Sequence, residues 1–474
     1  MTKTAPDFFK DLLTKFPFEP TNSQEILLEK LSNFIFDKNY QSLFLLKGYA
    51  GTGKTTTIST VVNNLWRTGK KAVLLAPTGR AAKVISGYSN RAAFTIHKKI
   101  YFPKKNKSGG VNFVLQPNKH TNTIFIVDEA SMISDAATGV KLFENGSLLD
   151  DLMSYVYSGV HCKLILIGDT AQLPPVKLSI SPALDAHKLS INYNKDVTEF
   201  ELDEVMRQHE ESGILINATD LRLQIANQGN QFKFQLNFPD LIRLIDGYDI
   251  QDAINTAYDN IGVEDTAFIV RSNKRANQYN QQIRSKIRGQ ENEISTGDFI
   301  MVVKNNYFWL KESSEAGFIA NGDICEILEI FSIKELYGFR FAEVKIRMID
   351  YPNQRPFETV LLLDTLSSET PSLSYEDSNR LYQEVAKDFA TEKSKYKQLL
   401  KIKKSKYFNA LQIKFSYAVT CHKSQGGQWK TVFIEQPYLP EGQNIEYLRW
   451  LYTAITRAQE KVYLIGFKDE MFED

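Results

Sequence analysis

The first part of the chain alternates short apolar runs with stretches whose apolar residues recur at helical spacing. Runs that are apolar at consecutive positions are typical of parallel strands that helices cover on both faces. Four such runs occur before residue 200, at residues 42–46, 72–76, 123–127 and 163–167. The pattern therefore predicts an α/β domain with a doubly wound parallel sheet.

A second group of apolar runs lies later in the chain, at residues 267–270, 431–434 and 461–465. The long stretch between the first two is β-rich or alternating, with turn signals such as Asn321-Gly322-Asp323. This pattern predicts a small antiparallel barrel inserted into a second α/β domain. The expected division is residues 1–200 for the first domain, 201–289 with 408–474 for the second, and 290–407 for the barrel insertion.

Two stretches are rich in lysine. A smaller insertion at residues 86–120 carries a lysine cluster followed by Ser108-Gly109-Gly110, a turn that would close a basic hairpin. The second stretch has seven lysines between Lys393 and Lys406 in a segment compatible with a helix. From composition alone, such stretches are most often solvated faces.

Composition narrows the functional classes. A chain of 474 residues with 43% hydrophobic residues can bury the cores of several domains, and its net charge of +1 gives no global attraction to nucleic acid, so such binding would need a local groove. Cys162, Cys325 and Cys421 show no CxxC spacing, which indicates simple thiols without a disulfide framework or zinc site. No apolar run approaches a membrane span, so we expect a cytoplasmic protein without membrane contact.

The stretch Gly48-Tyr49-Ala50-Gly51-Thr52-Gly53-Lys54-Thr55 matches the phosphate-binding loop GxxxxGK[ST], directly after a predicted strand and before a helical stretch. Glycines let backbone N–H groups close around phosphate oxygens, and the helix N-terminus adds positive potential. Lys54 would meet the β and γ phosphates, and Thr55 would ligate Mg²⁺. The predicted ATP cradle comprises Gly51, Thr52, Gly53, Lys54, Thr55 and Thr56.

Two carboxylates end the predicted strand at residues 123–127. Acidic residues at the end of a buried strand are hard to explain structurally, whereas an ATPase needs them there. Asp128 is the expected Mg²⁺ ligand, and Glu129 would orient or deprotonate the attacking water. ATP and Mg²⁺ are therefore the expected substrate and cofactor, although these features describe many ATPases.

Further stretches, taken in order, resemble the motifs of superfamily 1 helicases of the RecD and Dda branch. The resemblance covers roughly residues 21–466 and implies two RecA-like P-loop domains, with a pin hairpin inserted in the first and an SH3-like β-barrel in the second. The matching stretches are residues 21–24, 75–82, 95–98, 128–131, 168–176, 204–208, 272–277, 318–324, 418–429 and 451–458.

The resemblance also assigns roles to individual residues. Gln24 would read the adenine edge, Gln172 would sense the γ-phosphate, and Gln425 with Gly426 would turn toward the nucleotide. The candidate arginine fingers are Arg207 and Arg457, which an ATPase needs because an arginine aimed at the transferred phosphoryl stabilises its charge. The implied DNA contacts are Thr78, Arg80, Thr95 and His97 on the first domain, and Thr420, His422, Lys423 and Ser424 on the second.

The resemblance implies an ATP-dependent DNA helicase that moves 5′ to 3′ on single-stranded DNA and unwinds duplex. Its expected partners are single-stranded DNA, single-strand/duplex junctions and replication or repair proteins, with the protein itself a monomer. The alternatives are a 3′ to 5′ UvrD-type motor, a nucleic-acid-stimulated ATPase or binding protein without robust unwinding, and RNA as the track. The run Gln172-Leu173-Pro174-Pro175 differs from the UvrD pattern.

Cys421 and His422 are neighbours, but adjacent side chains on an extended segment point to opposite sides, and no third group orients them. A catalytic dyad is therefore rejected, and Cys421 is expected to be a packing residue. Aromatic side chains in the groove would stack on bases. The candidates, each with core packing as the alternative, are Phe94, Tyr101, Phe308, Trp309 and Trp429.

Overall fold

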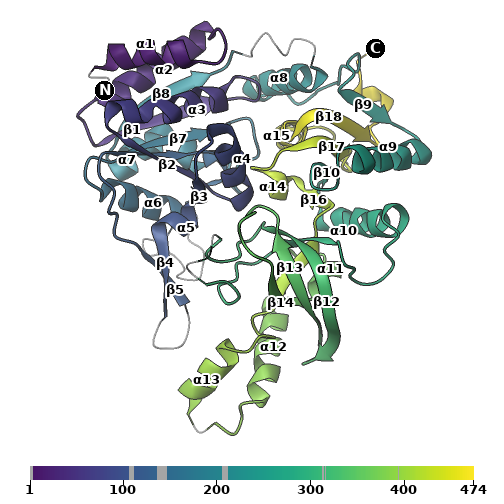
Figure 1. Ribbon diagram of the computed structural model, residues 1–474. Helices are drawn as coiled ribbons and strands as arrows, with labels where there is room; N and C mark the ends of the chain where they lie inside the picture. The colour runs from purple at the N-terminus through teal and green to yellow at the C-terminus, as the bar shows by residue number, and fades with distance from the viewer. Residues whose placement is uncertain are drawn as a thin grey trace.

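The computed structural model describes residues 4–105, 111–135, 147–204, 212–311, 314, 316–392 and 394–473, with backbone alone at residues 103–105 and 111–113. Two α/β domains lie side by side, a barrel lies below the second, and a hairpin projects from the first (Figure 1). No described helix is long and apolar enough to cross a bilayer.

The first domain is built on a six-stranded sheet in the order β3-β2-β6-β7-β1-β8, in which every neighbouring pair is parallel. The four apolar runs predicted before residue 200 are its central strands, so that prediction is confirmed. The strands are β1 (Ser42–Gly48), β2 (Lys71–Ala76), β3 (Ala93–Thr95), β6 (Thr123–Val127), β7 (Lys163–Gly168) and β8 (Asp196–Leu202).

Helices cover both faces of this sheet, because alternate residues of each strand enter separate hydrophobic clusters. On β1, Phe44 and Leu46 pack with α1 to α4, whereas Leu43 and Leu45 pack with α5 to α7. The helices are α1 (Ala5–Lys15), α2 (Asn22–Phe36), α3 (Lys54–Asn64), α4 (Gly79–Ser89), α5 (Ile96–Ile100), α6 (Leu148–Tyr157) and α7 (Ala186–Tyr193).

The second domain has a five-stranded parallel sheet in the order β16-β10-β17-β18-β9. Its strands are β9 (Leu241–Leu244), β10 (Thr266–Val270), β16 (Ala418–Thr420), β17 (Trp429–Glu435) and β18 (Ala458–Ile465). Its helices are α8 (Gly213–Ala226), α9 (Gly247–Asn260), α10 (Asn273–Gln282), α14 (Cys421–Ser424) and α15 (Ile445–Ile455), with a π-helical turn at Ile283–Ile287. The predicted second α/β domain, interrupted by an insertion, is confirmed.

The insertion contains the predicted barrel, which is closed by five strands. They are β11 (Phe299–Val302), β12 (Ile324–Leu336), β13 (Phe339–Met348), β14 (Phe357–Leu362) and β15 (Leu411–Phe415). The barrel thus ends at Phe415, beyond residue 407 where the sequence pattern ended it, because β15 pairs with both β11 and β14.

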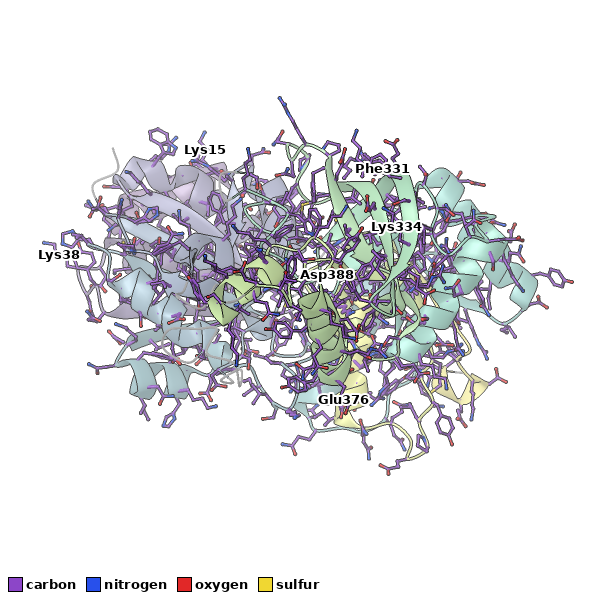
Figure 2. All side chains as sticks on the ribbon, turned by 90° about the horizontal axis from the view of Figure 1, so that it is seen from below. Lys15, Lys38, Phe331, Lys334, Glu376 and Asp388 are labelled. Atoms are coloured by element: carbon purple, nitrogen blue, oxygen red, sulfur yellow. The ribbon has the colours of Figure 1, made fainter. Side chains whose placement is uncertain are left out.

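A helical hairpin lies on the outside of the barrel, formed by α12 (Tyr375–Lys387) and α13 (Lys395–Lys403), after a short α11 (Asp364–Ser367). Leu381, Val385 and Ile402 pack against Phe339 and other barrel residues in one cluster. Seen from below, Glu376 and Asp388 mark the two ends of α12 (Figure 2). Part of the lysine-rich stretch is therefore a helix, α13, that buries Ile402 against this cluster.

The hairpin of the first domain consists of β4 (Tyr101–Lys105) and β5 (Val111–Leu115), which pair antiparallel. This agrees with the hairpin predicted within residues 86–120. Its expected turn, residues 108–110, lies outside the described residues. Short 3-10 turns complete the chain at Leu65–Thr68, Ala130–Met132, Pro182–Leu184 and Asp469–Met471.

Candidate functional site

A cavity of about 400 Å³ lies between the two α/β domains, where β1 and β6 end. Its walls come from the phosphate-binding loop and the acidic strand end of the first domain, and from Gly426, Gln428 and residues 456–459 of the second. Gly51 and Gly53 have φ of 75° and 81°, values that glycine adopts without strain. The loop leads into the N-terminus of α3, so its N–H groups suit an anion.

Lys54, the first residue of α3, lies on the wall of this cavity. Its Nζ donates to the carbonyl oxygen of Tyr49 in the same loop, at 2.6 Å. Burial lowers the pKa of Lys54, whereas the carboxylates of Asp169, Asp128 and Glu129 act in the opposite direction. The ammonium group is thus held within the loop, among three acidic side chains.

Asp128 and Glu129 follow β6, as predicted, and both line the cavity. The carboxylate of Asp128 accepts a hydrogen bond from the backbone N–H of Glu129 at 2.8 Å, and Glu129 has a φ of 54°. Burial, with the nearby Glu129 charge, raises the pKa of Asp128 to about 6. A buried acid of this kind favours a cation beside it.

These groups fit a magnesium ion. Thr55 and Asp128 line the same cavity and also share a smaller recess with Lys54. Among the described residues no group of three His, Cys, Asp or Glu side chains could hold a metal. One hydroxyl and one carboxylate suit Mg²⁺, which usually takes one or two protein ligands and fills its shell with water and phosphate oxygens.

Arg457 reaches this site from the second domain. Its Nη1 lies 3.7 Å from Oε1 of Glu129, and its guanidinium donates to the carbonyls of Thr453 and Gly427. Gln172 also lines the cavity, and its Oε1 is buried without a hydrogen-bond partner among the described atoms. The other candidate finger, Arg207, lies outside the described residues.

Several predicted nucleotide residues contact protein instead. Gln24 accepts from the N–H of Thr21 and donates to the carbonyl of Thr52 at 3.1 Å, so both ends of its amide are occupied. Gln425 donates to the carbonyl of Leu173 at 2.7 Å. Thr52, Gln24 and Gln425 are buried and are not among the residues that line the cavity, whereas Gly51, Gly53, Lys54, Thr55, Thr56 and Gly426 are.

On the first domain, the predicted DNA contacts lie at the starts of two helices. The Thr78 and Thr95 hydroxyls cap α4 and α5, accepting from the N–H groups of Ala81 and Lys98. Burial lowers the pKa of His97 to about 4, so its imidazole is neutral near pH 7. These three side chains are therefore neutral groups, and Thr95 is almost fully buried.

Arg80 crosses to the second domain. Its guanidinium stacks 4.1 Å from the centre of the Trp429 ring and donates to the carbonyl of Gln428. Trp429 is itself buried, so it serves packing and this cation–π contact, and its position does not support base stacking.

On the second domain, the predicted DNA residues follow β16. His422 is exposed, and Thr420 and Lys423 are half-buried beside a small recess. Ser424 is fully buried, and its hydroxyl donates to the carbonyl of Cys421. Ser424 is the last residue of the short α14, and its side chain points into the protein. Its position thus does not support the predicted contact with a nucleic-acid backbone.

Cys421 is fully buried, and burial raises the pKa of its thiol to about 12, which leaves it unreactive near neutral pH. Among the aromatic candidates, Tyr101 is also buried, with its hydroxyl donating to Asp151. The indole N–H of Trp309 donates to the carbonyl of Asn409. Phe308 keeps 39% of its surface exposed, and Phe94 is half-buried under the ammonium of Lys99.

Three residues at the interface were missed from sequence. Asp169 is the acid with the largest effect on Lys54, and Tyr452 and Arg449 of α15 bond to the first domain. A signal was present, because residues 449, 452 and 453 share one face of α15. Which surface that face meets could not be read from spacing.

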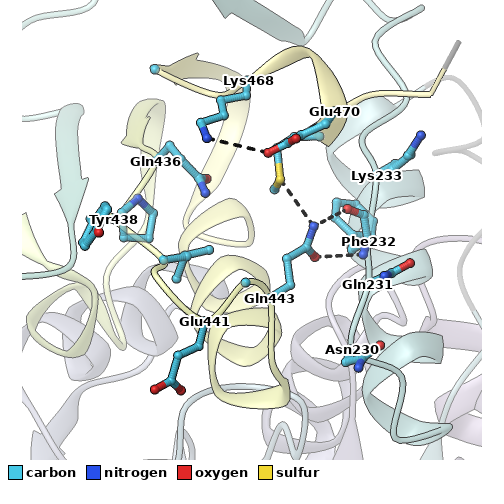
Figure 3. A pocket seen from close by; sticks show the side chains of 15 residues that line it. Asn230, Gln231, Phe232, Lys233, Gln436, Tyr438, Glu441, Gln443, Lys468 and Glu470 are labelled. Carbon is cyan, nitrogen blue, oxygen red and sulfur yellow. Dashed lines mark hydrogen bonds and ion pairs between the residues drawn. The ribbon is translucent and has the colours of Figure 1, made fainter.

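A larger cavity of about 760 Å³ lies at the carboxyl edge of the second sheet (Figure 3). Gln443 crosses it and bonds both backbone groups of Phe232. Its other labelled walls include Gln436, Tyr438 and Lys468. None of the predicted site residues lines it, so the smaller cavity between the domains is the candidate active site.

Two family models match the chain. Residues 36–228 match an AAA domain, and residues 415–465 match a UvrD-like helicase C-terminal domain. The first covers the phosphate-binding loop and the acidic strand end, and the second covers the segment from the end of the barrel to β18.

Relatives are similar over different lengths. An uncharacterized protein of Acanthamoeba polyphaga mimivirus is 25% identical over 94% of this chain and 99% of its own length. The ATP-dependent RecD2 DNA helicase of Deinococcus radiodurans is 31% identical over 37% of this chain, and the Dda helicase of phage T4 is 32% identical over 37%. The matches span 23% of RecD2 and 37% of Dda.

A solved structure of Pif1 helicase from Bacteroides has 14% identity and a TM-score of 0.45, over 96% of this chain and 94% of that one. The AAA model covers most of the first α/β unit and the UvrD-like model the C-terminal part of the second, and both units have the parallel sheets of RecA-like P-loop domains. Through these two domain models and these relatives, the chain is similar to superfamily 1 helicases of the RecD and Dda type.

Proposed function

We propose that the protein is an ATP-dependent DNA helicase that moves along single-stranded DNA and unwinds duplex. The observation that carries the proposal is the approach of Arg457, from the second domain, to within 3.7 Å of Glu129 on the first. A site completed by both domains can hydrolyse ATP only when they are correctly placed. Hydrolysis is then linked to the relative position of the domains, as a motor requires.

The residues divide the chemistry between them. Loop N–H groups bind the phosphates, and the Lys54 ammonium leaves the Tyr49 carbonyl to join them. Thr55 and Asp128 would hold Mg²⁺, which neutralises phosphate charge. Glu129 orients and deprotonates the attacking water, while Arg457 stabilises the charge that develops on the transferred phosphoryl. Gln172, with a buried orphan acceptor on the cavity wall, senses the γ-phosphate.

The proposed path of the single-stranded DNA, its track, crosses both domains. Thr78 and His97 on the first domain, and Thr420, His422 and Lys423 on the second, contact the strand through its backbone. A 5′ to 3′ polarity follows from the resemblance to the RecD and Dda branch. The proposed partners are single-stranded DNA, fork junctions and proteins of replication or repair, and the active form is a monomer.

The test is ATP hydrolysis with and without single-stranded DNA, followed by displacement of strands tailed at the 5′ or the 3′ end. We expect DNA to stimulate hydrolysis, and unwinding to occur from a 5′ tail. Lys54→Ala should lower kcat by at least about 10²-fold, since the phosphate clamp is lost.

Unwinding only from a 3′ tail would reverse the polarity. DNA-stimulated hydrolysis without unwinding would reduce the protein to a translocase or ATPase. Full hydrolysis by Lys54→Ala would move the active site elsewhere.

A further inference from the structure

The helix α15 presents one face to the first domain. Arg449, Tyr452 and Thr453 are spaced i, i+3 and i+4, so they lie side by side on the helix. Arg449 donates to the carbonyls of Thr170 and Gln172 in the loop after β7.

This loop is also held at its end. The hydroxyl of Thr453 accepts from the N–H of Leu173 at 2.8 Å, and Gln425 donates to the Leu173 carbonyl. Side chains of the second domain thus hold residues 170–173 of the first domain by hydrogen bonds to their backbone.

Tyr452 makes the most informative contact, because its hydroxyl joins two separate parts of the first domain. It accepts a hydrogen bond from the N–H of Ala50, in the phosphate-binding loop, at 3.0 Å. It donates to Oδ2 of Asp169, in the loop after β7, at 2.6 Å. Tyr452 is almost completely buried, so both bonds depend on this one hydroxyl.

Asp169 extends the hydrogen-bonded path from Tyr452 toward Gln172. Its other oxygen, Oδ1, accepts from the N–H of Ala171 at 2.9 Å and so shapes the turn that carries Gln172. Burial, with the Asp169 charge, raises the pKa of Tyr452 well above its ordinary value, so the hydroxyl keeps its proton and stays a donor. A continuous path of hydrogen bonds therefore runs from Ala50 through Tyr452 and Asp169 to the residue before Gln172.

We propose that Tyr452 is a positioning residue that links the phosphate-binding loop to the Gln172 turn and couples both to the placement of the second domain. The path begins and ends in the first domain but passes through a side chain of the second. A shift of α15 breaks both bonds of the hydroxyl at once. The phosphate-binding loop and the turn that carries Gln172 are then no longer held in a fixed relative position.

This inference rests on the proposed function, because coupling has a meaning only if DNA stimulates hydrolysis. The chain offers a matched control in Tyr447, on the same helix. Tyr447 is equally buried, but its hydroxyl donates to Gln436 within the second domain. Tyr447→Phe therefore removes a buried hydroxyl without touching the path.

The experiment compares wild type, Tyr452→Phe and Tyr447→Phe by the ratio of kcat with single-stranded DNA to kcat without it. This ratio does not depend on the active fraction, so a loss of stability alone leaves it unchanged. We expect Tyr452→Phe to lower the ratio at least about tenfold, as for a lost hydrogen bond to a charged group. Tyr447→Phe should keep the ratio within about twofold of wild type.

A second variant, Asp169→Asn, tests the path itself, and the double variant with Tyr452→Phe should have no lower ratio than the worse single variant. Multiplying effects, an unchanged ratio in Tyr452→Phe, or equal losses in both tyrosine variants would overturn the inference. A wild-type protein that ignores DNA would overturn the proposed function instead, which separates the two failures.

Discussion

Gly426 shows how a single residue can set the distance between the domains. Its φ of 72° is a left-handed conformation, and a Cβ there would lie 2.8 Å from Cβ of Ala81 and 3.2 Å from Oγ1 of Thr78. Gly426→Ala therefore adds backbone strain of about 1–2 kcal/mol and also a clash across the interface. We expect DNA-stimulated hydrolysis to fall at least about tenfold, measured as steady-state kcat.

Gly442 supplies the control, since its φ is 78° but nothing lies within 4 Å of a Cβ built on it. Gly442→Ala introduces the strain without the clash. Equal loss of activity in both variants would show that strain, and not the approach of the domains, limits the reaction.

The neighbours Cys421 and Lys423 separate packing from binding at the residue scale. We expect Cys421→Ala to keep hydrolysis and unwinding, with a stability cost of about 1–2 kcal/mol from the lost buried sulfur.

Lys423→Ala should weaken single-stranded DNA binding about fivefold, the equivalent of about 1 kcal/mol. Fluorescence anisotropy with a labelled oligonucleotide measures the difference, and a Cys421→Ala protein that folds but does not hydrolyse ATP would contradict the packing role.

At the scale of elements, sequence predicted the strands that are buried on both faces. The runs that became β1, β2, β6, β7, β10, β17 and β18 are mostly apolar at consecutive positions, because neighbouring strands and helices enclose them. All four edge strands, β3, β8, β9 and β16, were missed. β8 reads Asp-Val-Thr-Glu-Phe-Glu-Leu, and an edge strand can keep such polar residues in water.

The residues of the candidate site also fall into two groups, those that sequence motifs predicted and those whose partners they did not. Motifs predicted the phosphate-binding loop, the acidic pair and Arg457, because their chemistry depends on local order along the chain. The partners of Gln24, Gln425 and Ser424 come from tertiary packing, which no local pattern encodes.

The contact between the barrel and α4 gives a prediction at this scale. A Cβ at Gly79, the first residue of α4, would lie 2.9 Å from Oδ1 of Asp323, which immediately precedes β12. Burial, then the charge of Asp350, raises the pKa of Asp323 to about 8, although a hydrogen bond from the Ala320 N–H opposes this. The folded protein therefore retains a proton that the unfolded chain releases near the ordinary aspartate pKa of 3.8.

The stability contributed by this proton is complete below about pH 4 and is lost as pH rises to about 8. Asp323→Asn cannot ionise and keeps an acceptor for Ala320. Its stability relative to wild type should grow by up to about 1.4 kcal/mol per pH unit across that window, measured by urea unfolding at several pH values. Asp259→Asn, on an exposed position of α9, is the control. A constant difference for Asp323→Asn would contradict the buried proton.

At the scale of the whole molecule, α4 lies where three parts of the protein meet (Figure 1). Arg80 bonds to Gln428 of the second domain, while Lys83 reaches the barrel, donating to the Ile349 carbonyl and lying 3.6 Å from the buried carboxylate of Asp350. The helix that begins beside Thr78, one of the proposed DNA contacts, therefore also contacts the barrel. A movement of the second domain or of the barrel would therefore shift α4 and the proposed DNA contact at its start.

The distribution of charge predicts how strongly salt weakens binding to single-stranded DNA. The net charge is +1, and the basic side chains on the short helices that carry the proposed contacts are chiefly Lys98 and Lys99 of α5 and Lys423 of α14. Each neutralised phosphate of a single strand contributes about 0.7 to the slope of log affinity against log salt, so we expect a slope of about −2. Titrations by fluorescence anisotropy between low and moderate salt measure it.

The lysines of α13 are the competing source of charge, but that helix lies outside the barrel, and Lys401 is paired with Glu392 at 2.9 Å. Lys395→Gln with Lys397→Gln should therefore leave the slope unchanged, whereas Lys423→Gln should reduce it by about 0.7. A slope steeper than about −5 that falls in the α13 variant would mean that DNA also runs over the barrel hairpin. The proposed DNA path would then extend beyond the two RecA-like domains and onto α12 and α13 of the barrel insertion.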